Sequence, residues 1–197
     1  MERPYGICGQ TIMTLNGKFG RKYTRLKNYN YAANGYYFVT ICTFEKQGFF
    51  GNITHGKMQL STVGKIAQQY WSEIPQHSKH TYLDEFIIMP NHVHGIIIID
   101  NPDNSRRVVP WNDPPDVERD LSQTMSKLSP KSGTLSVIIR SYKSSVTRWC
   151  RQNGDIVFQW QSRFYENIIR DEKSLNNIRR YIINNPAKWT KDKNYVN

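Results

Sequence analysis

The segment TYLDEFIIMPNHVHGIIIID, residues 81–100, predicts a β-hairpin. β-branched and aromatic residues are typical of strands, and they indicate one strand over 81–89 and a second over 92–100. Pro90 and Asn91, between them, indicate a tight turn. The isoleucine run 96–99 does not alternate with polar residues. Because a half-exposed strand alternates, we expect the second strand to be central in a sheet, with both faces covered.

The flanking sequence adds further strands and helices on both sides of this hairpin. Upstream, residues 36–43 and 57–60 predict strands, and residues 62–74 predict a helix capped by Ser61 or Thr62. Downstream, apolar residues recur at helical spacing from Leu135 to Trp149, residues 156–169 indicate a strand plus a turn, and residues 173–184 a last helix before Pro186. This order predicts an α+β fold, an antiparallel sheet with helices packed on one face.

The length and composition fit one folded domain. The chain has 197 residues, of which 38% are hydrophobic and 22% charged, enough for a single hydrophobic core. We expect an N-terminal arm over 1–20 and a single domain over 21–197 that carries a surface insertion at about 101–134. That insertion is rich in Pro, Ser, Asp and Asn, which is typical of a long loop.

The net charge indicates a polyanionic partner. Lys and Arg total 27 against 16 Asp and Glu, which gives +11, and such an excess favours phosphate binding with release of counterions. The longest apolar run, 96–99, is too short to span a bilayer. The first twenty residues lack the apolar core of a secretory signal, and the three cysteines are scattered without metal-type spacing. These features predict a cytoplasmic location.

The clearest candidate for chemistry is the pair His92 and His94. Residues two apart on a strand project from the same face, so both imidazoles would point one way while Val93 points into the other layer. Two adjacent imidazoles can bind a divalent metal, although two ordinary hydrogen-bonded histidines are the alternative. Two ligands are too few for a closed structural zinc site, so open positions would be left for water or substrate oxygens.

The last predicted helix offers a tyrosine and an amide. Leu175, Ile178 and Ile182 form its apolar stripe, and Tyr181 and Asn185 lie together on one shoulder of that stripe. The alternative is that Tyr181 simply packs at the edge of the core. Helical spacing alone does not distinguish Tyr181 from the other tyrosines among the 12 in the chain. The remaining histidines occupy polar segments and are expected at the surface: His55, His77 and His80.

Basic and aromatic residues supply candidates for nucleic-acid contacts. For each single residue the alternative is a solvated side chain, so we expect a cluster to act rather than any one member. The candidates are Arg21, Lys22, Arg25, Lys27, Lys143, Arg148 and Arg163. Some of the abundant aromatic side chains could stack on unpaired bases.

Several motifs, taken in order, resemble one known family. Residues 90–94, PNHVH, resemble the His-hydrophobic-His motif of the HUH tyrosine transposases. Residues 160–166, Ile169 with Arg170, and the YIINNP ending at 181–186 are similar to the REP-associated tyrosine transposase branch, as are Tyr36, Phe38, Val39 and Thr40. The resemblance covers about residues 21–190.

The resemblance implies a fold, a reaction and a set of roles. It implies a ferredoxin-like sheet that carries His92 and His94 as metal ligands, with Asn185 as an amide-type third ligand for Mg²⁺ or Mn²⁺. Tyr181 would be the nucleophile that cleaves and rejoins single-stranded DNA near a hairpin through a 5′-phosphotyrosine intermediate. A REP-like hairpin would be the partner, association with the bacterial nucleoid the setting, and a homodimer one possible assembly, because some relatives exchange the tyrosine helix between subunits.

Three other functions compete with this one. A descendant that binds DNA or RNA hairpins without cutting them fits the charge equally well. A related HUH nuclease of the replication-initiation or conjugation type shares the chemistry, but residues 160–166 argue against it. A metallohydrolase that uses water is disfavoured because the sequence places no carboxylate near the histidines.

Overall fold

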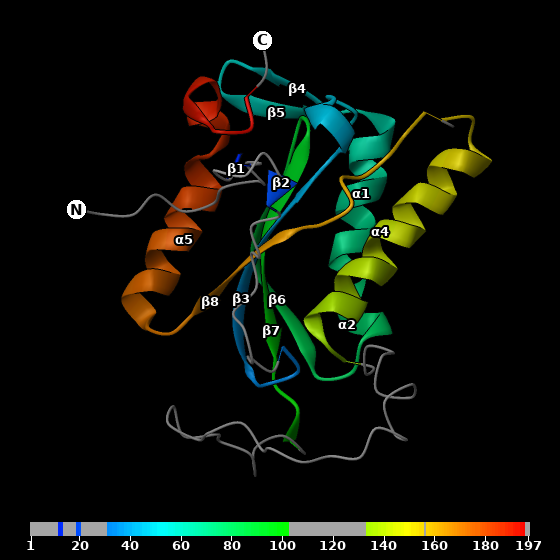
Figure 1. Ribbon diagram of the computed structural model, residues 1–197. Coiled ribbons are helices and arrows are strands. Elements are labelled where there is room, and N and C mark those ends of the chain that lie inside the picture. Colours follow the sequence, from blue (N-terminus) through cyan, green and yellow to red (C-terminus); the bar gives the residue numbers. More distant parts are fainter. Residues whose placement is uncertain (1–11, 14–18, 21–30, 103–132, 156, 196–197) are drawn as a thin grey trace.

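A computed structural model gives the architecture of the chain (Figure 1). It describes residues 31–102, 133–155 and 157–195, together with the short antiparallel pair β1 (Ile12–Met13) and β2 (Phe19–Gly20). Most of the expected N-terminal arm (1–20) and of the expected insertion (101–134) lies outside the described residues.

A four-stranded antiparallel sheet forms the centre of the fold. Its strands lie in the order β6 (Thr81–Met89), β7 (His92–Ile99), β3 (Gly35–Cys42) and β8 (Tyr165–Ile169). β6 and β7 are the predicted hairpin, and β7 lies between two neighbours, as its isoleucine run indicated.

Helices cover both faces of this sheet (Figure 1). α1 (Thr62–Ser72) and α4 (Leu135–Gln152) share one face, where Val39 and Ile97 belong to the larger hydrophobic core. The expected α+β fold, an antiparallel sheet with helices packed on one face, is therefore confirmed, and one further helix lies on the other face. α5 (Glu172–Asn184) lies against the opposite face, which carries Phe38 and Ile96.

Local signals in the sequence account for the helix ends. Ser61 caps α1, because its Oγ accepts a hydrogen bond from the Gly64 amide at 3.0 Å. Asp171 caps α5 in the same way through Ser174, at 2.7 Å. Thr134 occupies the N-cap position of α4, but among the described residues its side chain makes no capping hydrogen bond.

One glycine in β7 is required by close packing. A Cβ added to Gly95 would lie 2.3 Å from Cζ2 of Trp71, a fully buried residue of α1. Only a residue without a side chain lets the indole approach the strand, so Gly95 fixes how α1 sits on the sheet.

Shorter elements complete the end of the molecule nearest the β6–β7 turn. β4 (Gly51–Thr54) pairs with β5 (Lys57–Leu60), and of these two strands the sequence had predicted β5. η1 (Phe44–Lys46) and η4 (Pro186–Lys191) lie there as well, whereas α2 (Ile74–His77) lies at the opposite end, next to the start of β6 (Figure 1). Among the described residues, no helix combines the length and the apolar character needed to cross a membrane.

Candidate metal and tyrosine site

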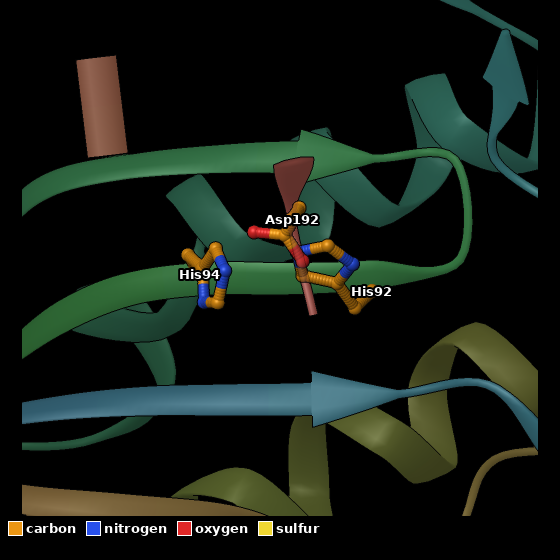
Figure 2. Close-up of side chains that lie close together, drawn as sticks. All are labelled: His92, His94 and Asp192. Atoms are coloured by element: carbon orange, nitrogen blue, oxygen red, sulfur yellow. The ribbon is translucent and has the colours of Figure 1, made fainter. Parts of the chain in front are cut away.

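The two histidines of β7 lie side by side on the face beneath α5. His92 is fully buried and His94 is 2% exposed, and their ring centroids are 4.3 Å apart. Figure 2 shows both imidazoles projecting from the same strand toward one carboxylate. The predicted common orientation of the pair is therefore what the structure has.

Asn91 determines the orientation of His92. Its amide nitrogen donates to the backbone oxygens of Lys46, at 3.0 Å, and Asn194, at 2.7 Å. The amide oxygen is thereby directed at His92 Nδ1, 2.8 Å away, and accepts the proton of that nitrogen. The acceptor lone pair of His92 consequently lies on Nε2, a buried atom with no hydrogen-bond partner.

Thr40 determines the orientation of His94. Its Oγ1 lies 2.8 Å from His94 Nδ1, and the two residues face each other across the β3–β7 ladder. The ring of Phe38 stacks on His94 with centroids 5.4 Å apart. Nε2 of His94 is therefore the nitrogen that points toward α5.

α5 brings Tyr181 and Asn185 to the histidines. Tyr181 Oη lies 3.1 Å from His94 Nε2 and donates to Asp192 Oδ2 at 3.0 Å. Asn185 Nδ2 donates to the same oxygen at 2.9 Å. Asn185 keeps helical dihedral angles although Pro186 follows, so it stays one turn beyond Tyr181.

Asp192 is the member of the site that the sequence analysis missed. It follows η4 and is held by the backbone amide of Asn194, which donates to Oδ1 at 2.7 Å. His92, His94 and Asp192 offer ligand atoms that all lie within 4.8 Å of one another (Figure 2). The expectation that no carboxylate lies near the histidines was wrong, because η4 folds the chain back over them.

Burial controls the protonation of the site. It lowers the pKa of His92 well below its ordinary value, with further contributions from His94 and Lys46. Burial also lowers the pKa of His94 to about 4, although the Asp192 carboxylate opposes the change. Both imidazoles are therefore neutral at pH 7, which is the form that binds metal ions.

The same surroundings disfavour a free phenolate at Tyr181. Burial is the largest cause that raises its pKa, followed by the charge of Asp192 and the hydrogen bond to it. The phenol accordingly keeps its proton until a cation or a proton acceptor assists its loss.

The donor set fits a divalent metal ion. Within the part of the chain that the structure describes, His92 Nε2 and Asn185 Oδ1 are both buried without a hydrogen-bond partner, an arrangement that costs on the order of 1–3 kcal/mol per atom when nothing binds there. With His94 and Asp192 beside them, these atoms offer imidazole nitrogen and carbonyl or carboxylate oxygen. Such mixed sites suit Mn²⁺ and related ions, and the oxygen donors suit Mg²⁺.

The other predicted residues lie away from this cluster or outside the described residues. Arg21, Lys22, Arg25 and Lys27 belong to the part of the chain that is not described. Lys143 and Arg148 are on α4, across the sheet from the histidines, and Arg163 is exposed just before β8. The remaining histidines are exposed, as predicted: His55, His77 and His80.

The fold is shared with a solved transposase. A structure of a REP-associated tyrosine transposase bound to a REP hairpin aligns with 86% of this chain and 76% of its own, at a TM-score of 0.55. Sequence identity in that alignment is 17%, so the likeness is one of fold.

Sequence comparison gives a nearer relative. No protein-family model matches the chain. A protein of Haemophilus influenzae (strain ATCC 51907 / DSM 11121 / KW20 / Rd), described as an uncharacterized protein, is 42% identical over 176 residues, which span 89% of this chain and 93% of the relative. The chain therefore belongs to the same family as this Haemophilus influenzae protein, and it has a transposase-like fold.

Proposed function

We propose that the protein is a metal-dependent single-strand DNA transposase that cleaves and rejoins DNA through a tyrosine. The contact of Tyr181 Oη with both His94 Nε2 and the Asp192 carboxylate carries the proposal. A tyrosine in ordinary packing at the edge of a core would direct its hydroxyl to water. Here the hydroxyl instead contacts side chains that could hold a metal ion, of which both histidines are buried.

His92 and His94 would hold Mg²⁺ or Mn²⁺ through their Nε2 atoms. Asn185 Oδ1, the predicted third ligand, and Asp192 are the oxygen donors beside them. A bound divalent ion supplies positive charge that polarises a non-bridging phosphate oxygen and favours the phenolate of the nearby tyrosine.

Tyr181 acts as the nucleophile in this proposal. Asp192 accepts the phenol proton across the 3.0 Å hydrogen bond, a role for which the sequence had identified no residue. The phenolate oxygen forms a bond to phosphorus while the bond from phosphorus to the 3′-oxygen breaks, and that oxygen takes up a proton. The products are a 5′-phosphotyrosine and a free 3′-hydroxyl, and attack by another 3′-hydroxyl reverses the step and joins strands without ATP.

A DNA strand with a hairpin is the proposed substrate. The fold neighbour is bound to a REP hairpin, and the excess of 27 Lys and Arg over 16 Asp and Glu suits a phosphate backbone. The proposed phosphate contacts are Arg21, Lys22, Arg25, Lys27, Lys143, Arg148 and Arg163.

The position of Asp192 also supports a second candidate function, that of a nuclease that uses water as the nucleophile. A carboxylate beside two metal-binding imidazoles can accept a proton from water as readily as from a phenol. The two candidates differ in their product, because hydrolysis leaves no protein attached to DNA.

The test uses single-stranded hairpin DNA labelled at the 3′ end, so that the label stays on the fragment bound by tyrosine. Three proteins are incubated with this DNA and Mg²⁺ or Mn²⁺: wild type, Tyr181→Phe and the control Tyr36→Phe. Tyr36 is a partly exposed tyrosine on the same face of the sheet as the histidines. We expect a labelled protein-sized band that only Tyr181→Phe lacks. Nicking without such a band would favour the water-using nuclease, and binding without nicking would favour a hairpin-binding protein.

A further inference from the structure

α4 presents a continuous basic face on the side of the sheet opposite the histidines. Arg140, Lys143, Thr147 and Arg151 recur at three- and four-residue spacing along one side of the helix, and α4 contains no Asp or Glu. The opposite side of α4 is its buried stripe, which includes Tyr142. All the charge of this helix therefore points away from the hydrophobic core and is of one sign.

This basic face forms one wall of a groove. The other wall is the segment 158–164, and the groove encloses about 760 Å³. Among the described residues that line it there is no Asp or Glu, whereas Arg140, Lys143, Arg148 and Arg151 all line it, together with aromatic side chains such as Phe164. Within the described part of the chain none of these four cations forms an ion pair.

Lys143 is fixed at the centre of the groove rather than solvated. Its Nζ donates to the Gln161 backbone oxygen and lies 5.9 Å from the ring centroid of Trp160. Trp160 Nε1 in turn donates to the Lys143 backbone oxygen at 3.1 Å. Partial burial lowers the pKa of Lys143 to about 8, so an anion placed in the groove would stabilise its charged form.

The groove reaches the end of the sheet that carries the histidines. The Gln161 amide donates to the Cys42 backbone oxygen at 2.9 Å, and Cys42 is paired with His92 across the β3–β7 ladder. The segment 158–164 thus continues the sheet beside β3, at the end of the sheet that carries the histidine pair.

We propose that this groove binds the phosphate backbone of one nucleic-acid strand, the strand that flanks the cleavage point. The placement beside the cleavage point rests on the proposed function, whereas binding itself does not. A concave basic groove with aromatic side chains suits a single strand, whose phosphates meet the cations and whose unpaired bases can contact the rings. A duplex is the competing occupant for the test to exclude.

The test compares two variants that lose the same charge. Arg140→Gln/Arg151→Gln removes two cations from the groove, and Lys57→Gln/Lys65→Gln removes two exposed cations on β5 and α1. Anisotropy of a labelled single-stranded oligonucleotide is measured in EDTA over a range of salt concentrations, and thermal unfolding checks that both variants are folded. We expect about tenfold weaker binding for the groove variant and a salt slope shallower by roughly 1.4, with the control close to wild type.

Three outcomes separate the claims. Equal affinity and salt slope in the two variants would overturn the groove proposal, as would an equal loss for a duplex of the same length. Loss of binding in the groove variant, with adduct formation retained at saturating DNA, supports the groove as a strand-binding site. The groove variant could bind DNA more weakly although wild type forms no adduct with DNA. That result would support the groove as a binding site and contradict the proposed transferase function.

Discussion

The two faces of the sheet are built on opposite principles. Beneath α5, two buried imidazoles and a buried amide lie beside a half-buried phenol and a half-buried carboxylate, and hydrogen bonds join the phenol and the amide to that carboxylate. On the far side of the sheet, α4 carries cations along a groove open to solvent. The difference fits the proposed functions of the two faces, because catalysis needs fixed, desolvated groups while binding of a polyanion needs accessible charge.

Removing both histidines should have the largest effect, because it abolishes the proposed chemistry on one face and leaves DNA binding on the other. We expect His92→Ala/His94→Ala to reduce DNA cleavage by about a thousandfold or more, and to abolish Mn²⁺ binding measured by electron paramagnetic resonance. DNA affinity in EDTA should be unchanged, because the binding groove lies across the sheet. His77→Ala/His80→Ala, which alters two exposed histidines, is the control, and Mn²⁺ binding that survives in the β7 variant would contradict the assignment.

Asp192→Asn should have the next largest effect. The amide still accepts a hydrogen bond from Tyr181 but no longer takes its proton, so we expect cleavage to fall on the order of 100-fold or more. Single-turnover rates measured against Asp100→Asn, an exposed carboxylate beyond the end of β7, would test this. An unchanged rate would show that Asp192 is not the proton acceptor.

Asn91→Ala should weaken metal binding without removing a ligand. The substitution releases His92 from the hydrogen bond that directs its Nε2 toward the site, and such outer partners typically contribute 10- to 100-fold in metal affinity. Titration calorimetry with Mn²⁺ gives the affinity, and groove binding of DNA should not change. If metal affinity stays at the wild-type value, Asn91 serves only to hold the turn.

Acid should destabilise the metal-free protein by a smaller amount. His94 has a pKa of about 4 in the folded chain, against about 6.5 when unfolded. Between these values the unfolded chain binds the extra proton, so the stabilisation is complete above about pH 6.5 and is lost as pH falls toward 4. We expect the free energy of unfolding to fall by roughly 1 kcal/mol per pH unit in this window.

Urea unfolding in EDTA at several pH values measures this dependence. His92, whose pKa is lowered in the same direction, should add to it. Replacing His94 by Gln should flatten the curve, and an unchanged slope in that variant would contradict the assignment of the pH dependence to His94.

The sequence predicted the parts of the site that local spacing controls. Alternation along a strand placed His92 and His94 on one face, and helical spacing placed Tyr181 beside Asn185. The resemblance to a known family supplied the reason to bring these two pairs together. The basic face of α4 was visible in part, through Lys143 and Arg148.

The parts that it missed depend on distant segments. Asp192 lies in no helix or strand and reaches the site only because η4 turns the chain back over β7. Asn91 was read as a turn residue, although its amide is held by backbone oxygens from Lys46 and Asn194. No local spacing reports contacts between residues so far apart in sequence.

The central claim is that Tyr181 forms a covalent bond with DNA. Wild-type protein would be incubated with hairpin DNA and Mn²⁺, digested with protease and nuclease, and analysed by mass spectrometry of its tyrosine-containing peptides. We predict a nucleotide attached through phosphate to the peptide that contains Tyr181, and to no other tyrosine. Cleaved DNA with a free 5′-phosphate and an unmodified Tyr181 peptide would contradict the proposal.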